Sequence, residues 1–158
     1  MEKYDTLMIA AKLQLKNADH MASVTYQVVN DPKLLMAIAE KLYNSLTYAI
    51  SSLLHRDYLF KVISNLPENF GDQLRLFQRY SINKYNLNKE IITLVKELQE
   101  LVEFRKKSPV EFIKRGDFIV CSSGYNTKSI NLKKMKQYVS QVKLHIQEIN
   151  NVLIKNGL

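Results

Sequence analysis

The sequence predicts an all-α fold, an up-and-down bundle of four to five helices whose first two helices form a long antiparallel pair. Apolar residues recur every three or four positions over most of the 158 residues, as they do on one face of a helix. Only 4 Gly and 3 Pro are present, too few for a loop-rich β architecture. The length and the 46% hydrophobic content indicate one globular domain, residues 1–158.

The first predicted helix covers residues 2–30, and Asn30-Asp31-Pro32 ends it, with Asp31 expected to cap the next helix. Its expected buried face comprises Leu7, Ala11, Leu15, Ala18, Ala22, Thr25 and Val29. The second helix is predicted over residues 32–63, and the short connection makes the pair antiparallel. Small side chains would let another helix approach the second helix closely: Ala37, Ala39, Ser45, Ala49, Ser51 and Ser52.

Two further helices are predicted, a short one over residues 69–80 and a longer one that follows the asparagine-rich turn at 83–88 and runs to about residue 107. Residues 117–130 are rich in β-forming residues around Ser123-Gly124, so we expect a short β-hairpin or an ordered loop there. The last helix begins after Asn131, its expected N-cap. It carries the most regular apolar repeat of the chain: Leu132, Met135, Val139, Val142, Ile146, Ile149 and Leu153.

Several classes of protein are excluded by composition. The single cysteine, Cys121, rules out an intrachain disulfide framework. We expect its thiol to be buried and inert. Basic residues nearby leave a reactive thiol as the alternative. No apolar run approaches the roughly 20 residues that span a bilayer. The N-terminal segment is charged from its start, so we expect no signal peptide and a cytoplasmic protein.

No motif for catalysis, metal binding or a cofactor is found. The scattered glycines do not form a phosphate-binding loop, and the three histidines lie on different predicted helices. A site assembled in space from His20 and His55 is the one metal arrangement that we considered. The prediction is therefore no catalytic residue, no metal site and no cofactor.

The net charge of +8 is concentrated in one stretch. Residues 105–143 hold 10 basic residues against Glu111 and Asp117 only, whereas residues 1–79 are nearly neutral. A localised positive field attracts polyanions, although a solvated face that only maintains solubility has the same composition. The predicted nucleic-acid-binding residues are Lys106, Lys107, Lys114, Arg115, Tyr125, Lys128, Lys133, Lys134 and Lys136. The lysines and the arginine would neutralise phosphates, and Tyr125, at a predicted turn, would stack on a base.

Two segments carry a resemblance to known proteins. The first is Ala18-Asp-His-Met-Ala-Ser-Val-Thr-Tyr26, followed by Val29-Asn-Asp-Pro-Lys-Leu-Leu35 and the helix to Leu54. The second is Ser108-Pro-Val-Glu-Phe112, with Phe118-Ile-Val-Cys121 and Tyr125. Both resemble a small group of uncharacterised archaeal all-helical proteins. The resemblance covers about half of the chain and implies the fold and an archaeal cytoplasm.

More distantly, the arrangement resembles the HEPN helical bundles. This resemblance implies a long antiparallel helix pair, dimer formation and a role in RNA cleavage or nucleotide handling. Ribonucleases of that superfamily carry an Arg followed four to six residues later by a His. This chain has no such pair: His55 precedes Arg56, and neither Arg79 nor Arg105 is followed by a His at that distance.

Three functions are therefore weighed. The leading hypothesis is a non-catalytic helical protein that binds RNA or a nucleoprotein through segment 105–143. The first alternative is a homodimeric protein–protein adaptor, suggested by the apolar seam of the last helix and the small residues of the second helix. The second alternative is a degenerate HEPN-like enzyme that handles RNA or nucleotides, with His20, Tyr26, His55 and Arg56 as candidates.

Overall fold

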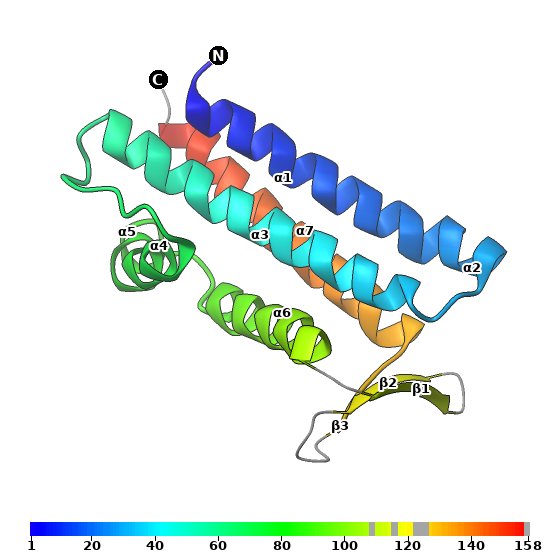
Figure 1. Ribbon diagram of the computed structural model, residues 1–158. Helices are drawn as coiled ribbons and strands as arrows, with labels where there is room; N and C mark the ends of the chain where they lie inside the picture. Colours follow the sequence, from blue (N-terminus) through cyan, green and yellow to red (C-terminus); the bar gives the residue numbers. More distant parts are fainter. Residues whose placement is uncertain (108–109, 115–116, 122–126, 157–158) are drawn as a thin grey trace.

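The protein is an all-α bundle with a small β-sheet at one end (Figure 1). The computed structural model describes the backbone of residues 1–107, 110–114, 117–121 and 127–156, and the side chains of residues 1–103 and 130–155. The helical elements are α1 (Lys3–His20), η1 (Met21–Thr25), α2 (Tyr26–Val29), α3 (Leu34–Leu59), α4 (Phe70–Leu76), η2 (Phe77–Ser81), α5 (Ile82–Lys84), α6 (Glu90–Lys107) and α7 (Leu132–Asn156). The strands are β1 (Val110–Lys114), β2 (Asp117–Cys121) and β3 (Thr127–Ile130).

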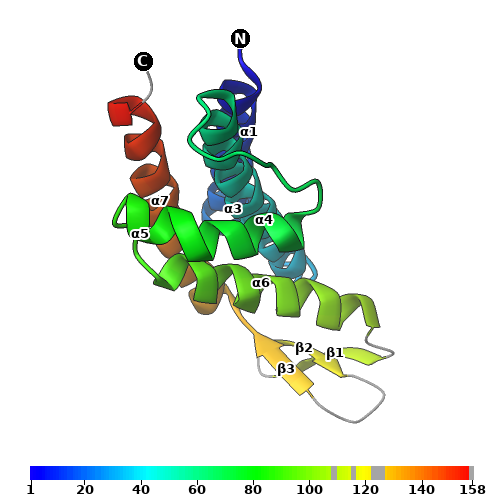
Figure 2. The ribbon, with the colours of Figure 1, turned by 90° about the vertical axis from the view of Figure 1, so that its left-hand side faces the viewer.

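Three long helices, α1, α3 and α7, lie side by side, with the start of α1 and the end of α7 at the same end of the bundle (Figure 1). The elements α4, η2, α5 and α6 cross this group as a second layer (Figure 2). Helix α3 is central, because it packs against α1, α4, α6 and α7. One continuous cluster of buried side chains draws on all these helices.

The predicted antiparallel pair of α1 and α3 is confirmed, and small side chains hold it together. Ala11, Ala39 and Ala49 are fully buried. Two buried serines of α3 donate hydrogen bonds to carbonyl oxygens of α1: Ser45 Oγ to Ala11 at 2.7 Å and Ser52 Oγ to Tyr4 at 2.6 Å. Such bonds require the two backbones to lie close together, which only small residues permit.

A π-helical turn, η1, interrupts the first helix and changes which residues face the core. Each π-turn adds a residue relative to α-helical spacing, so the residues after it are rotated around the helix axis. Val29 is consequently 58% exposed, and Tyr26 packs against the core instead. The expectation that Val29 belongs to the buried face was therefore wrong, because it assumed unbroken α-helical spacing up to residue 30.

Polar side chains accept backbone hydrogen bonds near the starts of three later helices, and the sequence predicts caps at two of them, Asp31 and Asn131. The Asp31 carboxylate accepts from the Lys33 N–H at 3.0 Å. However, α3 begins only at Leu34, and its N-cap residue, Lys33, makes no side-chain cap, so Asp31 binds the turn before the helix and does not cap it. The Asn69 side chain accepts from the Asp72 N–H at 2.8 Å at the start of α4. Asn131 Oδ1 accepts from the Lys134 N–H at 2.9 Å, which confirms Asn131 as the cap of α7. The apolar repeat of α7 is buried from Met135 onward.

The segment between α6 and α7 forms an antiparallel sheet of order β1-β2-β3. Val110 pairs with Cys121 across the first ladder, and Phe118 pairs with Ile130 across the second. The sequence predicts two extended segments within 117–130, and the structure adds β1 as a third. Ile130 is fully buried and joins the sheet to the core at the start of α7.

Candidate functional site

Of the nine predicted nucleic-acid-binding residues, three lie where their side chains are described. Lys133, Lys134 and Lys136 are all exposed on the first two turns of α7. Six others lie outside the described side chains: Lys106, Lys107, Lys114, Arg115, Tyr125 and Lys128. Cys121, at the end of β2, also lies outside them, so its predicted burial stays a prediction.

The first half of α7 carries an exposed basic face, which we define by Lys133, Lys136 and Lys143. Residues 132–147 contain four lysines and no aspartate or glutamate. Lys133 projects from the side of α7 opposite its buried residues, because it lies two residues, about 200°, from Met135. Lys136 and Lys143 flank the buried side, each about 100° from the buried residue before it, Met135 or Val142. All three lysines fall within roughly a quarter of the circumference of the helix. Lys143 is 3.9 Å from the Asp19 carboxylate, and both side chains are largely exposed. The Asp19 charge offsets part of the charge of Lys143, so Lys133 and Lys136 carry most of the positive potential of this face.

Lys134 lies on another side of the same helix, in a polar hollow between α6 and α7. Its ammonium lies 5.8 Å from the centre of the Tyr138 ring, and Glu97 and Glu100 line the same hollow. The Tyr138 hydroxyl donates to Glu97 at 3.3 Å. Burial, and then the Glu97 charge, raise the pKa of Tyr138 to about 12. Lys134 thus shares its hollow with two glutamates and lies on a different side of α7 from the basic face.

Lys133 and Lys134 lie in the first turn of α7, at the positive end of its dipole, and Lys136 follows closely, whereas Lys143 lies near the middle of the helix. Cations are disfavoured at a helix N-terminus and anions are favoured there. The first turn of α7 nevertheless contains no acidic residue. Local stability therefore does not account for these lysines, and the arrangement concentrates positive potential near residues 131–136.

The four residues considered for an enzyme are not brought together. His55 shares a hollow with Tyr4 near the start of α1, whereas His20 is at the opposite end of that helix, roughly 24 Å away at 1.5 Å per residue. The His20–His55 metal arrangement that the sequence left open is therefore excluded by the geometry. Tyr26 follows His20 at its end of the bundle, and the His20 ring lies 3.4 Å from the Thr25 hydroxyl.

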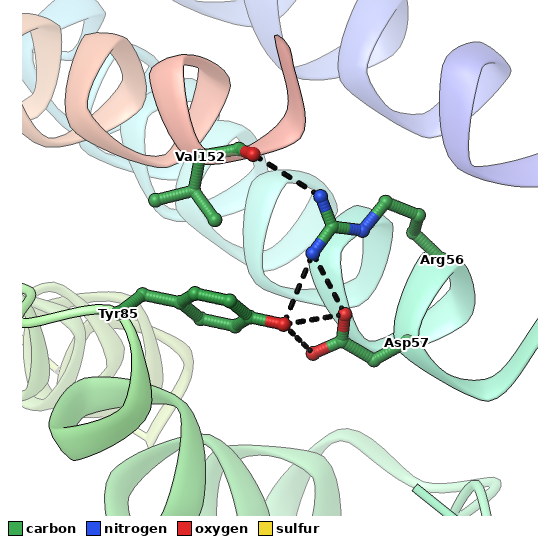
Figure 3. A network of polar contacts seen from close by, with 4 residues as sticks. All are labelled: Arg56, Asp57, Tyr85 and Val152. Atoms are coloured by element: carbon green, nitrogen blue, oxygen red, sulfur yellow. Dashed lines mark hydrogen bonds and ion pairs between the residues drawn. The ribbon is translucent and has the colours of Figure 1, made fainter. Parts of the chain in front are cut away.

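Arg56 is a structural residue rather than an exposed functional one (Figure 3). Its side chain is 2% exposed and forms an ion pair of 2.9 Å with Asp57, which is fully buried. Its Nη1 donates to the Val152 carbonyl of α7 at 3.1 Å, and its Nη2 donates to the Tyr85 hydroxyl at 3.0 Å. A buried charge needs such partners, because an unpaired one would cost several kcal/mol. The network joins the end of α3 to α7 and to the turn after α5.

A pocket of about 640 Å³ lies between the start of α1 and the end of α3, and we call it the α3 pocket. Tyr4, Tyr58, Leu59 and Ile63 form its apolar walls, and Lys3, His55 and Lys61 lie among its polar residues. The sequence reasoning missed this pocket. Its one local signal is the run Tyr58-Leu-Phe-Lys-Val-Ile63, which is too apolar for a solvent-exposed helix end.

The described part of the chain contains neither a metal-binding cluster nor a membrane-spanning helix. In that part of the chain, no group of three or more His, Cys, Asp and Glu side chains is placed to hold a metal ion. Among the described helices, none combines the length and apolarity needed to cross a membrane.

The comparisons with known proteins identify no class and no particular protein. No family model matches the chain, and neither a curated protein nor a solved structure matches it.

Proposed function

We propose that this protein is a non-catalytic helical protein of the cytoplasm that binds single-stranded RNA through segment 105–143. The exposed basic face of α7 supports this proposal, because it places three lysines on one side of a rigid helix with no carboxylate between residues 132 and 147. Single-stranded nucleic acid is bound by such charge arrays largely without regard to sequence. The single cysteine agrees with a reducing compartment.

The test is the salt dependence of binding to a labelled single-stranded RNA of mixed sequence, followed by fluorescence anisotropy. Each phosphate contact contributes about 0.7 to the slope of log affinity against log salt for a single strand. We expect the double substitution Lys133→Gln with Lys136→Gln to lower that slope by roughly 1.4. Absence of binding at low salt would overturn the proposal.

Two controls separate a specific face from net charge alone. The pair Lys89→Gln with Lys155→Gln removes the same charge from exposed positions elsewhere, so the slope should stay near that of the wild type. Lys134→Gln should have a smaller effect than Lys136→Gln, because Lys134 lies beside Glu97 and Glu100. Equal losses from all these variants would show that only net charge matters.

The enzyme alternative is tested in the same samples. A non-catalytic protein leaves the RNA at full length during prolonged incubation. Cleavage by the wild type that His55→Ala abolishes would replace our proposal with the enzyme hypothesis. Cleavage that His55→Ala leaves unchanged would exclude that residue.

The adaptor alternative receives no support from the surfaces that suggested it. The apolar seam of α7 is buried within one chain, with Met135, Val142 and Ile149 each fully buried. Ser45 and Ser52 of α3 are covered by α1, as their hydrogen bonds to Ala11 and Tyr4 show, and Ser51 bonds to Gln73 of α4. A homodimer therefore stays a prediction, to be checked by light scattering over a range of concentrations.

A further inference from the structure

The end of α3 exposes an unusual amount of apolar surface. Tyr58, Leu59, Phe60 and Val62 are 50%, 46%, 42% and 38% exposed, and they are almost consecutive in the chain. Tyr4 of α1 meets the Phe60 ring edge-on, with 6.1 Å between ring centres. Single exposed apolar residues are common on soluble proteins, but a contiguous group beside a pocket indicates a binding surface.

The turn that forms this surface is fixed by backbone hydrogen bonds. The Val62 N–H donates to the Asp57 carbonyl at 2.7 Å and the Lys61 N–H donates to the Tyr58 carbonyl at 3.1 Å, the pattern of a Schellman motif. The side chain of Asp57 is held in the buried network with Arg56 and Tyr85. The α3 pocket is therefore built on a rigid support and does not have to form when a ligand arrives.

Lys61 occupies the left-handed position of this motif, with φ of 61°. That position normally takes glycine or asparagine, because other side chains are strained there. The other two described residues with positive φ outside glycine are both asparagines, Asn30 and Asn86. Folding alone therefore does not explain a lysine at residue 61, whereas its side chain lines the α3 pocket.

The charges around the pocket favour an anion. Lys3 and Lys61 oppose Glu2, the one carboxylate in the lining, which leaves an excess of one positive charge. His55 Nδ1 lies 2.8 Å from the Ser51 carbonyl, and it must donate because a carbonyl oxygen only accepts. This bond fixes the orientation of the imidazole ring at the pocket. These polar groups lie at the edge of walls made of Tyr4, Tyr58, Leu59 and Ile63.

We infer that the α3 pocket binds a small apolar monoanion, a carboxylate with a hydrocarbon or aromatic body. The body packs against the tyrosine and leucine walls, and the carboxylate pairs with Lys61 and Lys3. A volume of about 640 Å³ lies within the range of small-molecule sites. This inference is independent of the proposed RNA binding. The residues that line the α3 pocket come from the start of α1, the end of α3 and the turn after it. These parts of the chain lie at the opposite end of the bundle from the start of α7 (Figure 1).

The probes are decanoate, decanol and decylammonium, which share a body and differ in head-group charge. Titrations of the full chain are followed in two-dimensional amide NMR spectra. Decanoate should shift the signals of residues 2–4 and 55–64 and should bind about tenfold more tightly than decanol, because a charged hydrogen bond adds that much. Equal binding of the three probes, no binding, or shifts elsewhere would overturn the inference.

The decisive variant is Lys61→Asn, which removes the charge and keeps a residue suited to the left-handed conformation. We expect it to weaken decanoate binding about tenfold while leaving decanol binding unchanged. Lys89→Asn removes the same charge from an exposed site outside the pocket and should change neither affinity. Equal loss in both variants would show that only net charge matters, and so would overturn the inference.

A dilution series distinguishes another occupant of the same surface. If the signals of residues 58–62 shift with protein concentration in the absence of probe, the surface is a contact between copies of this chain. That result would also overturn the inference. Signals that stay constant on dilution and shift on addition of decanoate support it.

Discussion

The hydroxyl of Tyr85 lies 2.8 Å and 2.9 Å from the two carboxylate oxygens of Asp57, and it ties the turn after α5 to the end of α3. Asp57 is fully buried and receives its other side-chain hydrogen bond from Arg56. The Tyr85 ring also lies 5.6 Å from the Arg56 guanidinium carbon. One tyrosine thus helps to satisfy both charges of a buried ion pair.

We predict that Tyr85→Phe destabilises the protein by about 1–3 kcal/mol, because it leaves a buried carboxylate with one hydrogen bond fewer. The change is measured by urea denaturation. Tyr80→Phe is the matched control, since Tyr80 is also half-buried and no hydrogen bond of its hydroxyl is described. Equal losses in the two variants would mean that the Tyr85 hydroxyl contributes nothing specific.

We also predict that the protein loses stability at alkaline pH because of Tyr85. Burial, and then the hydrogen bond to Asp57, raise the pKa of Tyr85 to about 12 from an ordinary value of 10.0. The folded state therefore keeps this proton at a pH where the unfolded state loses it. The stabilisation is complete below about pH 10 and is lost as the pH rises toward 12.

Ultraviolet absorbance of the phenolate and urea denaturation over this pH range test the prediction. Tyr138 also has a pKa raised to about 12, so Tyr85→Phe should remove only part of the alkaline loss of stability. The combination of Tyr85→Phe with Tyr138→Phe should remove more. Titration of both phenols near the ordinary pKa in the folded protein would contradict the assignment.

The sequence predicts the features that depend on residues close together in the chain, and it does not predict those that depend on residues far apart in the chain. Helix positions, the cap at Asn131 and the antiparallel pair were predictable, because spacing, capping and short connections are local properties. The π-turn at η1 was not, because it responds to packing between α1 and the rest of the bundle. Nor was the Arg56 network, whose partners Tyr85 and Val152 are 29 and 96 residues away.

Some features of the candidate site also follow from the local sequence, and others depend on tertiary packing. Exposure of Lys133 and Lys136 follows from the helical pattern, whereas the separation of Lys134 depends on Glu97 and Glu100 of α6. Tertiary packing also brings Tyr4 to the end of α3, so the α3 pocket has no sequence motif. Its strained residue, Lys61, looks like an ordinary lysine in the sequence.

We predict that the protein loses stability in mild acid because of His145. Burial lowers its pKa below 6.5 and outweighs the charges of Glu148 and Glu90, which act in the opposite direction. The unfolded state therefore binds a proton more readily than the folded state. The stabilisation is complete above about pH 6.5 and decreases as the pH falls through the lowered pKa.

The measurement is the free energy of unfolding at a series of pH values from neutral to mildly acidic. His145→Gln should flatten this profile. His20→Gln, at an exposed position, is the control for the loss of a histidine side chain. A wild-type profile that rises as the pH falls would show that the two glutamates outweigh burial.

Close approach of α1 and α3 predicts intolerance of larger side chains at Ser45. This residue is fully buried against Ala11, so Ser45→Leu should cost about 1–3 kcal/mol by forcing the helices apart. Ser45→Ala should cost about 1 kcal/mol, because it removes one hydrogen bond and adds no volume. Urea denaturation measures both, with Ser140→Leu on the exposed side of α7 as the control.

Lys61 offers a variant that should stabilise the protein. Glycine adopts positive φ without the steric penalty that a Cβ atom brings, so Lys61→Gly should raise the free energy of unfolding by roughly 1 kcal/mol. Asn86→Gly is the control for the same change at a second left-handed position, and it should give a smaller gain because asparagine tolerates this conformation. Thermal and urea unfolding measure both. If Lys61→Gly instead lowers the free energy of unfolding, the contacts of the lysine side chain stabilise the fold by more than the backbone strain destabilises it. A structural role would then explain the lysine at this position.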